Sequence, residues 1–374
     1  MTRLVLAGGG HAHLFVLREL ARCRPRDLEV TLISPSPWMS YSGMLPGWMA
    51  GHYRLEECRI DLRPLSSRAG AGGIWQALIG MDADRREVRL EDGRALGYDL
   101  LSIDVGSETE CESLANLGGR LTPVKPLLDF QARWLGLIEA ARRGDRGYLL
   151  LVAGGGAAGV ELSMAARVAL RRVSPASSVT LVAGQPGLVP THGERVRQHV
   201  ERALKRLAVD VIDVNATGLS DGVLLDDGRK VEADHVIAAT GARAPRWLKS
   251  SRLAKDAFGY IAVDAFHRST SHESVFAAGD VCSRAGSALA RSGVHAVRAA
   301  PVLAHNLLAA LDQRPLRPFA PSRRSLYLLS TGDGRAIGSW GGFAAEGAWV
   351  GRLKDVIDRR FVRSFTTRDP NRQD

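Results

Sequence analysis

The sequence has few cysteines, and none of them form a motif. Its four cysteines, Cys23, Cys58, Cys111 and Cys282, are scattered over 374 residues without a Cys-x-x-Cys pair. Structural zinc sites and dithiol redox sites need cysteines at close spacing, so this distribution argues against both. It fits a reducing compartment, where disulfides are rare.

Long apolar runs are also missing. No uninterrupted run reaches the roughly 18 residues that a membrane-spanning helix requires. The N-terminal run Leu4 to Ala7 leads straight into glycines, which indicates a strand and not a signal peptide. We therefore expect a cytoplasmic protein.

Lysine is scarce as well. Only six of the 50 basic residues are lysine, so the formal charge of +10 comes almost entirely from arginine. Such a charge can attract phosphates, nucleic acid or anionic lipid. The arginines are spread along the whole chain, which favours an arginine-biased genome as the cause. No basic block with interleaved aromatics is present, so we expect no nucleic-acid partner.

The two halves of the chain repeat one order of elements. An apolar run (4–7) precedes Gly8-Gly9-Gly10 and a helical pattern, and another (149–153) precedes Gly154-Gly155-Gly156 and a second helical pattern. In each half there follow a second strand, a hairpin with an acidic-Gly turn, and a strand that ends at Gly106 or Gly241. This duplication predicts an α/β fold with two Rossmann-like dinucleotide-binding domains.

The glycine loops have a specific physical use. The first glycine makes a tight turn, the second lets backbone N–H groups approach a pyrophosphate, and the third lets helix and strand pack closely. Gly154, Gly156 and Gly159 meet all three requirements. In the first copy Gly8 and Gly10 match, but His13 stands in the third position.

Both copies lack an expected acidic residue. An Asp or Glu about 20 residues downstream usually binds the ribose hydroxyls. The first copy has Ser34 there, which can still make one hydrogen bond, and the second has Ala183, which cannot. Nucleotide binding is therefore less secure in the second domain than in the first.

Two histidines, His11 and His13, flank the start of the first helix. An i, i+2 pair does not share a helical face, and no third ligand is evident, so we expect no metal site. Packing near a pyrophosphate, or a hydrogen bond to it, is the favoured role.

After the second unit, an apolar run ends in Gly279-Asp280. A carboxylate at a strand end can accept hydrogen bonds from a polyol chain, or it can simply cap the following helix.

The order GGG, DVGS, GGGAAGVE, ATGA and VFAAGD resembles flavoproteins with two dinucleotide domains, including type II NADH dehydrogenases and sulfide:quinone oxidoreductases. GGGHAH (8–13), YSGMLPGWMAGHY (41–53), IDLRPL (60–65) and PVKP (123–126) are most similar to the NADH-dehydrogenase-like flavoprotein module found fused to selenide, water dikinase. The resemblance covers essentially the whole chain.

This resemblance implies that residues 1–118 and 252–325 form an FAD-binding domain, that 119–251 form an inserted NAD(P)H-binding-like domain, and that 326–374 form a small C-terminal cap. Asp280 would hold the FAD ribitol, and the loop from Tyr41 to Pro46 would lie along the flavin. The remaining implied FAD contacts are Gly8, Gly9, Gly10, His11, Ser34, Ser42, Leu78, Gly106 and Gly279.

The resemblance also suggests the reaction. NAD(P)H would reduce the flavin, which would pass electrons to a quinone-like acceptor. Glu161, in the helix after the second glycine loop, matches a glutamate proposed to assist hydride or proton movement, although a helix N-terminus also favours glutamate for its dipole. Lys125, between two prolines, is a candidate for the flavin edge or for a rigid linker contact.

Two alternatives stay open. Sulfide oxidation needs two cysteines beside the flavin, and only Cys111 and Cys282 are candidates. A non-enzymatic redox sensor linked to selenium metabolism would suit a second domain that no longer binds nucleotide.

The C-terminal segment has an amphipathic, basic pattern. In residues 349–365, Trp349, Leu353, Val356, Ile357 and Phe361 recur at helical spacing among arginines. This pattern is typical of a helix in a membrane interface, here the cytoplasmic face of the inner membrane, and also of a packed cap or a homodimer surface.

Overall fold

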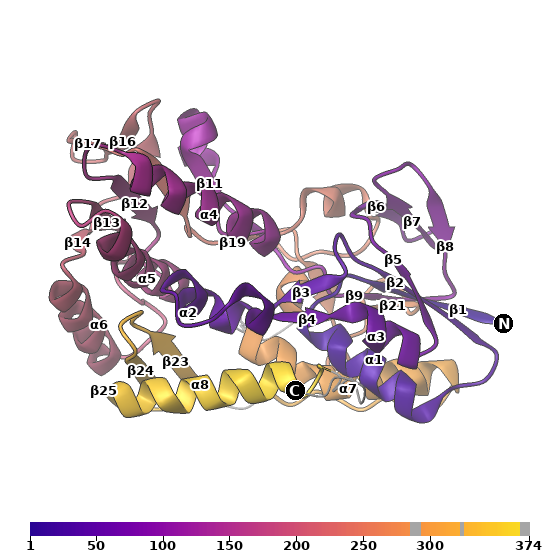
Figure 1. Cartoon of the computed structure of the whole chain (residues 1–374). Coiled ribbons are helices and arrows are strands. Elements are labelled where there is room, and N and C mark those ends of the chain that lie inside the picture. Colours follow the sequence, from indigo (N-terminus) through magenta and orange to yellow (C-terminus); the bar gives the residue numbers. More distant parts are fainter. Residues whose placement is uncertain (285–292, 322–324, 367–374) are drawn as a thin grey trace.

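The chain forms two α/β domains that lie next to each other (Figure 1). The structure is a computed structural model that describes residues 1–284, 293–321 and 325–366. Each domain contains a five-stranded parallel sheet and a three-stranded antiparallel sheet. The α/β class with Rossmann-like sheets, which the duplicated glycine loops predict, is confirmed.

The first sheet has the order β21-β9-β1-β2-β5. Leu4 to Ala7 of β1 and the whole of β9 are buried, because helical residues pack on one face of the sheet and residues of the accompanying antiparallel sheet pack on the other. Its strands are β1 (Thr2–Ala7), β2 (Leu28–Ile33), β5 (Ala71–Ile74), β9 (Leu100–Ile103) and β21 (Val275–Ala277). The accompanying antiparallel sheet consists of β6 (Leu78–Asp82), β7 (Glu87–Leu90) and β8 (Ala95–Gly97).

The second sheet has the order β11-β18-β12-β13-β14. Its strands are β11 (Leu121–Pro123), β12 (Leu149–Ala153), β13 (Ser178–Val182), β14 (Asp210–Ile212) and β18 (His235–Ala238). The second antiparallel sheet consists of β15 (Ala216–Gly218), β16 (Gly222–Leu225) and β17 (Lys230–Glu232). The two parallel sheets have equivalent strand orders. Their edge strands differ in position along the chain, because β21 is the last strand of the first sheet in sequence and β11 is the first strand of the second.

The chain crosses between the domains twice, at the paired strands β10 (Glu108–Thr109) and β19 (Ala242–Arg243). The remaining strand pairs are β3 (Trp38–Ser40) with β4 (Arg59–Asp61), and β20 (Ile261–Val263) with β22 (Cys282–Arg284). The α-helices before the cap are α1 (His11–Cys23), α2 (Leu45–Met49), α3 (Leu62–Arg68), α4 (Leu127–Arg143), α5 (Ala157–Val173), α6 (Glu194–Leu207) and α7 (Gly293–Leu311). Short 3-10 helices span Ser42–Met44, Leu55–Cys58, Glu112–Arg120, Arg246–Ser250 and Gly279–Val281.

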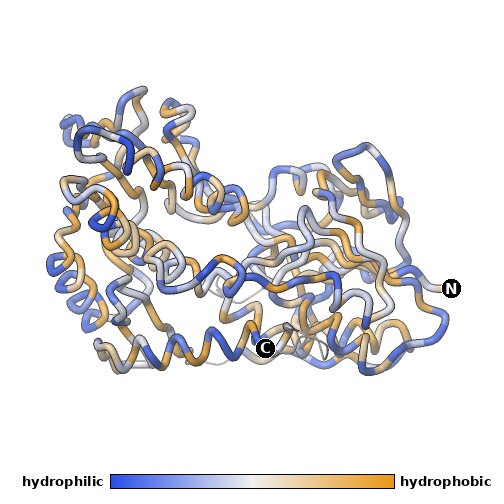
Figure 2. Tube along the Cα trace, viewed as in Figure 1, coloured by the Kyte–Doolittle hydropathy of each residue, from blue (hydrophilic) through white to orange (hydrophobic). Residues whose placement is uncertain are grey.

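Helix α7 is long and apolar enough to cross a membrane by length and composition alone. It packs against α1, and its buried face includes Leu303, Asn306 and Leu307. The Asn306 amide donates to the carbonyl oxygens of Phe266 and Arg317, so this buried polar group is satisfied within the protein. These contacts are those of a core helix. Figure 2 shows hydrophobic residues along α7 and through the sheet strands.

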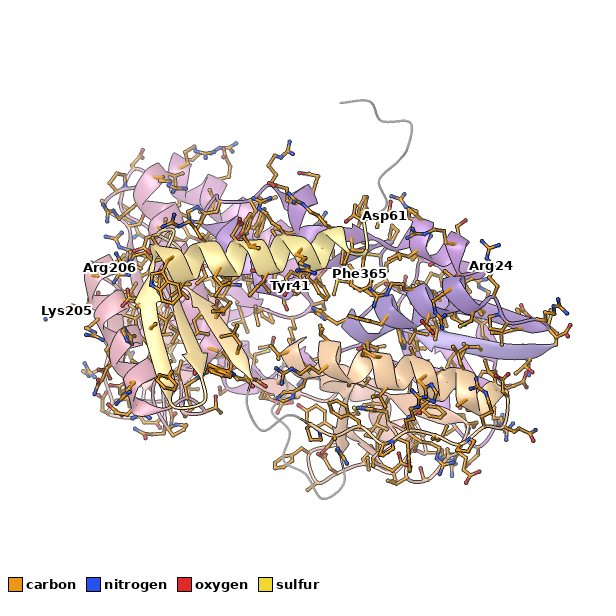
Figure 3. All side chains as sticks on the ribbon, turned by 90° about the horizontal axis from the view of Figure 1, so that it is seen from below. Arg24, Tyr41, Asp61, Lys205, Arg206 and Phe365 are labelled. Atoms are coloured by element: carbon orange, nitrogen blue, oxygen red, sulfur yellow. The ribbon has the colours of Figure 1, made fainter. Side chains whose placement is uncertain are left out.

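The C-terminal cap combines the antiparallel strands β23 (Leu326–Ser330), β24 (Ala336–Trp340) and β25 (Phe343–Gly347) with helix α8 (Ala348–Arg363). Figure 3 shows α8 lying across the molecule, from these strands toward Phe365. Helix α8 buries Val350, Lys354, Asp358 and Val362, at intervals of four residues.

Helix α8 therefore turns a polar pair inward and apolar residues outward. The Lys354 ammonium donates to the Gly43 carbonyl at 2.6 Å and to Asp358 at 2.7 Å. Trp349, Leu353, Val356 and Ile357 are 39–62% exposed. Phe361, which the sequence pattern placed on the same stripe, instead stacks on Tyr41, because it lies where α8 meets the first domain.

Candidate functional site

A cavity of about 470 Å³ opens at the carboxyl ends of the first parallel sheet, where open α/β sheets bind ligands. It begins beside Leu78 and Trp247 and runs past the first glycine loop to Asp280 and Lys125. The lining contains most of the expected FAD contacts, namely Gly8, Gly9, Gly10, His11, Ser34, Ser42, Leu78, Gly106, Gly279 and Asp280. Pro46 does not line it, because this proline is buried in the first turn of α2.

The first glycine loop needs its glycines for close packing. Gly8 has a φ of +102°, and a Cβ atom there would lie 2.3 Å from the carbonyl oxygen of Asp104. This approach joins the loop to the end of β9 and leaves the N-terminus of α1 facing the cavity. A helix N-terminus with a close main chain is a suitable place for a pyrophosphate.

The two histidines of this loop have different roles. His13 is fully buried, donates from Nδ1 to the Gly8 carbonyl at 2.6 Å, and accepts at Nε2 from the Ser102 hydroxyl at 2.8 Å. Burial lowers its pKa to about 4, so His13 is a neutral structural residue. His11 lines the cavity, and its buried Nε2 atom has no hydrogen-bond partner among the residues that the structure describes.

Asp280 and Lys125 form an ion pair in the cavity, with 2.6 Å between Lys125 Nζ and Asp280 Oδ2. The ammonium also donates to the Ser107 hydroxyl at 2.8 Å, and the Lys125 backbone N–H donates to Thr109. Lys125 precedes α4 and Asp280 follows β21, so the tertiary fold brings together residues 155 positions apart. Lys125 therefore lines the cavity and does more than make a linker contact.

Asp104 is a site residue that the sequence reasoning did not single out. It directly follows β9, is 4% exposed, and accepts hydrogen bonds from the backbone N–H groups of Ala12 and His13. The signal was present in the sequence: an Asp stands two residues before Gly106, where the second unit has Ala239 two residues before Gly241.

The second glycine loop repeats this geometry without the carboxylate. Gly154 has a φ of +123°, and a Cβ atom there would lie 2.2 Å from the Ala239 carbonyl oxygen. A Cβ atom on Gly159 would collide with the Gly154 carbonyl. In contrast, nothing lies within 4 Å of the positions that Cβ atoms would take on Gly156 and Gly241. The N-terminus of α5 is therefore open to a ligand.

Glu161 lies in α5, where this helix meets the cap. Its carboxylate accepts the backbone N–H of Ser330 in β23 at 2.6 Å. Burial raises the pKa of Glu161 to about 7, and the nearby Lys354 ammonium opposes this rise. Glu161 does not line the cavity of the first domain, so the structure separates it from the expected FAD contacts.

Cys111 and Cys282 are not brought together by any contact in the described part of the chain. The Cys282 thiol donates to the carbonyls of Ala277 and Gly279, whereas Cys111 lies near Arg243. Neither cysteine forms a disulfide in the described part of the chain, and among the described residues that line the cavity there is no cysteine. This geometry does not favour sulfide oxidation.

Comparison with known proteins agrees with the two-domain fold. The sequence profile of the family described as pyridine nucleotide-disulphide oxidoreductase matches residues 2–301. An NADH dehydrogenase-like protein of Mycobacterium tuberculosis is 26% identical over 76% of this chain and 73% of its own. Ferroptosis suppressor protein 1 of Homo sapiens is 28% identical over 74% of this chain and 72% of its own.

Solved structures share the fold at lower identity. The sulfide:quinone oxidoreductase of Aquifex aeolicus superposes with a TM-score of 0.79 and 18% identity, covering 98% of this chain and 92% of its own. NDH2 of Plasmodium falciparum in complex with NADH has a TM-score of 0.79 and 14% identity, covering 97% and 98%. The chain is therefore a flavoprotein oxidoreductase that belongs to the pyridine nucleotide-disulphide oxidoreductase family.

Proposed function

We propose that this chain is an FAD-dependent NAD(P)H dehydrogenase, similar to type II NADH dehydrogenases, which passes electrons to a quinone-like acceptor. One observation carries the proposal: the first domain has a cavity lined by a phosphate-type glycine loop and an Asp–Lys pair, and the second domain has a glycine loop that is open to a ligand. The two sites suit two dinucleotides, one bound as a cofactor and one as a substrate.

The residues of the first site fit FAD. Gly9, Gly10 and His11 line the cavity at the N-terminus of α1, where a pyrophosphate can approach the main chain, and the buried Nε2 of His11, which has no partner among the described residues, needs a polar group. Asp280 can accept hydrogen bonds from ribitol hydroxyls, and Lys125 holds the Asp280 carboxylate in place. When bound, the flavin supplies the capacity to accept a hydride or an electron pair.

The second site fits the NAD(P)H substrate through its main chain. Gly156 begins α5 with open space around it, so the pyrophosphate of a nucleotide can approach the helix N-terminus. Ala183 offers the ribose no hydrogen bond from its side chain. Main-chain groups of the glycine loop and the electrostatic field at the N-terminus of α5 therefore provide most of the binding of NAD(P)H.

Glu161 is the residue that we assign to proton movement. It lies between the inserted domain and the cap, and its raised pKa of about 7 lets it hold or release a proton at neutral pH. The Lys354 ammonium stabilises the ionised form, and the Ser330 N–H orients the carboxylate.

The outer face of the cap supports contact with a membrane that supplies the quinone. Besides the four apolar residues of α8, Trp340 and Phe343 at the β24–β25 turn are 54% and 73% exposed. Arg360 and Arg363 lie on the same helix and can attract anionic lipid. An exposed apolar face flanked by arginines is the arrangement of an interfacial helix.

The test is to mix the purified yellow protein anaerobically with NADH, NADPH or sulfide and to follow the visible flavin absorbance. We expect rapid bleaching by NADH or NADPH and recovery of the colour when a soluble quinone is added. Bleaching by sulfide alone would move the chain to sulfide oxidation. If no donor bleaches the flavin, the dehydrogenase proposal is wrong and a non-enzymatic flavoprotein is the better interpretation.

A further inference from the structure

The two duplicated units differ at one position in the centre of their phosphate sites. Asp104 follows β9 as Ala239 follows β18, since β1 pairs Ala7 with Ile103 and β12 pairs Ala153 with Ala238. The Ala239 methyl group lies 3.6 Å from the place of a Cβ on Gly159 and carries no charge. Only the first unit therefore has a carboxyl group at the start of its nucleotide-binding helix.

The Asp104 carboxyl group lies between two parts of the expected FAD site, the first glycine loop and the Gly279-Asp280 turn. Asp104 Oδ2 accepts the N–H of Ala12 at 2.7 Å and that of His13 at 3.1 Å, both in the first turn of α1. A Cβ atom on Gly10 would lie 2.4 Å from its carboxyl carbon, and one on Gly279 would lie 2.7 Å from Oδ1. Asp104 thus touches the glycine loop on one side and the Gly279-Asp280 turn on the other.

An ionised Asp104 would have no cation to balance it there among the described residues. The histidines that α1 contributes, His11 and His13, have pKa values lowered to about 4 by burial, so both are neutral. From α7, His295 also has a pKa that burial lowers, and the Ala296 methyl lies toward Gly279.

The remaining charged groups do not offset the negative charge of an ionised Asp104. Asp280 adds a second carboxylate, and Lys125 gives its ammonium to Asp280 and Ser107. Burial, and to a smaller extent Asp280, raises the pKa of Asp104 to about 7, although its two backbone donors act in the opposite direction. A pyrophosphate at the same helix N-terminus brings further negative charge, which favours the neutral carboxyl still more.

We propose that Asp104 takes up a proton when FAD binds, so that a neutral carboxyl shares the N-terminus of α1 with the pyrophosphate. The proton comes from solvent, and no bond other than the new O–H is formed. Neutral Asp104 keeps one oxygen for the two helix N–H groups and has an O–H that can donate to the cofactor. This inference rests on the proposed FAD site, but not on the identity of the electron donor or acceptor.

The proposal predicts how FAD affinity depends on pH. If free Asp104 titrates near pH 7 and bound Asp104 well above it, FAD binding takes up almost no proton at pH 6 and close to one at pH 8. Affinity should then fall about tenfold between these pH values. Asp104→Asn, whose amide oxygen can still accept the helix N–H groups, should bind FAD equally well at both.

The experiment is serial dilution of the holoprotein at pH 6 and pH 8, with the fluorescence of released FAD as the readout. Titration calorimetry of the full chain with FAD in two buffers of different ionisation enthalpy counts the protons directly. Glu108→Gln is the matched control, because it removes another carboxylate of the cavity and should leave the pH dependence unchanged.

Three results would overturn the proposal: wild-type affinity that is equal at both pH values, pH dependence that persists in Asp104→Asn, or loss of FAD from that variant at both. If the variant does not fold, the wild-type proton count decides alone. Failure of the proposed function gives a different result, a bound flavin that NAD(P)H does not reduce, which leaves the proton count unaffected.

Discussion

At the scale of single residues, the first site depends on partners that face each other across the domain boundary. Asp280 of the first domain is held by Lys125, which stands where the chain enters the second. A different boundary, between the second domain and the cap, places Glu161 of α5 against the backbone of Ser330. In each of these contacts, a charged side chain of one part of the molecule binds to a group of another part.

Asp280→Ala should weaken FAD binding. The substitution removes charge-assisted hydrogen bonds and leaves the Lys125 ammonium without its carboxylate partner, a cost of roughly 1.5–3 kcal/mol, or about 10- to 150-fold in affinity. The measurement is FAD retained after gel filtration of dilute protein. Glu273→Ala, which removes an exposed carboxylate just before β21, is the control and should retain FAD. Full retention in Asp280→Ala would place the ribitol contact elsewhere.

Glu161→Gln should change how stability depends on pH. A carboxyl whose folded pKa is raised to about 7 binds more protons in the folded protein than in the unfolded chain between about pH 4.5 and pH 7. Its contribution to stability is therefore present at low pH and is lost as pH rises through that range. The variant cannot ionise at position 161, so it should match wild type at pH 5 and unfold at a higher temperature at pH 8.

Thermal unfolding at these two pH values checks the prediction for Glu161. A gain in the variant at pH 8 of roughly 1–3 kcal/mol is expected. An equal melting temperature for both proteins at pH 8 contradicts it.

At the scale of elements, the N-terminus of α5 and the outer face of α8 are two surfaces without a partner in the described structure. The first follows from Gly156, which has open space around it while Gly154 and Gly159 are tightly packed. The second surface exists because α8 packs through the Lys354–Asp358 pair and its flanking valines, and leaves the apolar residues Trp349, Leu353, Val356 and Ile357 exposed.

Gly156→Val should abolish flavin reduction by NAD(P)H and leave FAD bound. A Cβ atom there has no described atom within 4 Å, so folding should be preserved, but a valine side chain blocks the approach of a pyrophosphate to α5. Stopped-flow reduction of the holoprotein is the measurement. Gly154→Ala serves as a contrast, because its Cβ collides with Ala239 and should lower the melting temperature. Unchanged reduction in Gly156→Val means that the second loop is structural only.

Leu353→Glu combined with Val356→Glu should release the protein from anionic liposomes. Both residues are exposed, so the fold should persist, while a membrane-facing surface becomes acidic. Truncation of α8 is a poorer test, because it also removes the buried Val350 and Lys354. Leu135→Glu, on the exposed face of α4, is the control. If wild type stays in the supernatant at low salt, α8 does not contact membrane in this way.

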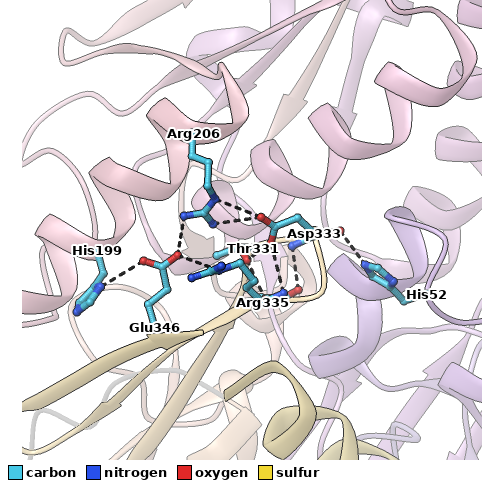
Figure 4. A network of polar contacts seen from close by, with 9 residues as sticks. His52, His199, Arg206, Thr331, Asp333, Arg335 and Glu346 are labelled. Carbon is cyan, nitrogen blue, oxygen red and sulfur yellow. Dashed lines mark hydrogen bonds and ion pairs between the residues drawn. The ribbon is translucent and has the colours of Figure 1, made fainter. Parts of the chain in front are cut away.

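At the scale of the whole molecule, the cap fastens the two domains together. Figure 4 shows Arg206 of α6 reaching Asp333 and Glu346 of the cap, with His199 and Arg335 also around Glu346. On the other side, Arg359 of α8 pairs with Glu57 of the first domain at 2.6 Å. The cap therefore links the two domains through ion pairs on both sides.

Glu346→Ala should destabilise the contact between the cap and α6. The Glu346 side chain is 9% exposed, and its loss leaves Arg206 and Arg335 without a shared partner, so we expect roughly 1–3 kcal/mol of destabilisation. Hydrogen exchange should accelerate in α6 and β25 more than in β1. The control is Glu139→Ala, which removes exposed pairs on α4 and should cost less than about 1 kcal/mol. A uniform increase in exchange over the whole chain would argue against a local role for this network.

Much of the fold could be predicted from local sequence. The glycine loops, the acidic-Gly hairpins and the buried strands depend on the conformations that glycine permits and on apolar runs, so both units are evident without coordinates. Most of the FAD contacts that the resemblance implied, Asp280 among them, line the cavity.

Tertiary structure alone decided which groups meet. The sequence distinguishes Asp104 from its counterpart Ala239, but it does not indicate that Asp104 binds the start of a helix 92 residues earlier or that Lys125 pairs with Asp280. It also does not indicate that α8 buries Lys354 while four apolar residues of its stripe stay exposed. A periodic pattern identifies the faces of a helix, but burial depends on what packs against each face. Here the Gly43 carbonyl and Asp358 satisfy a buried ammonium, so the inner face of α8 can hold a Lys–Asp pair between Val350 and Val362.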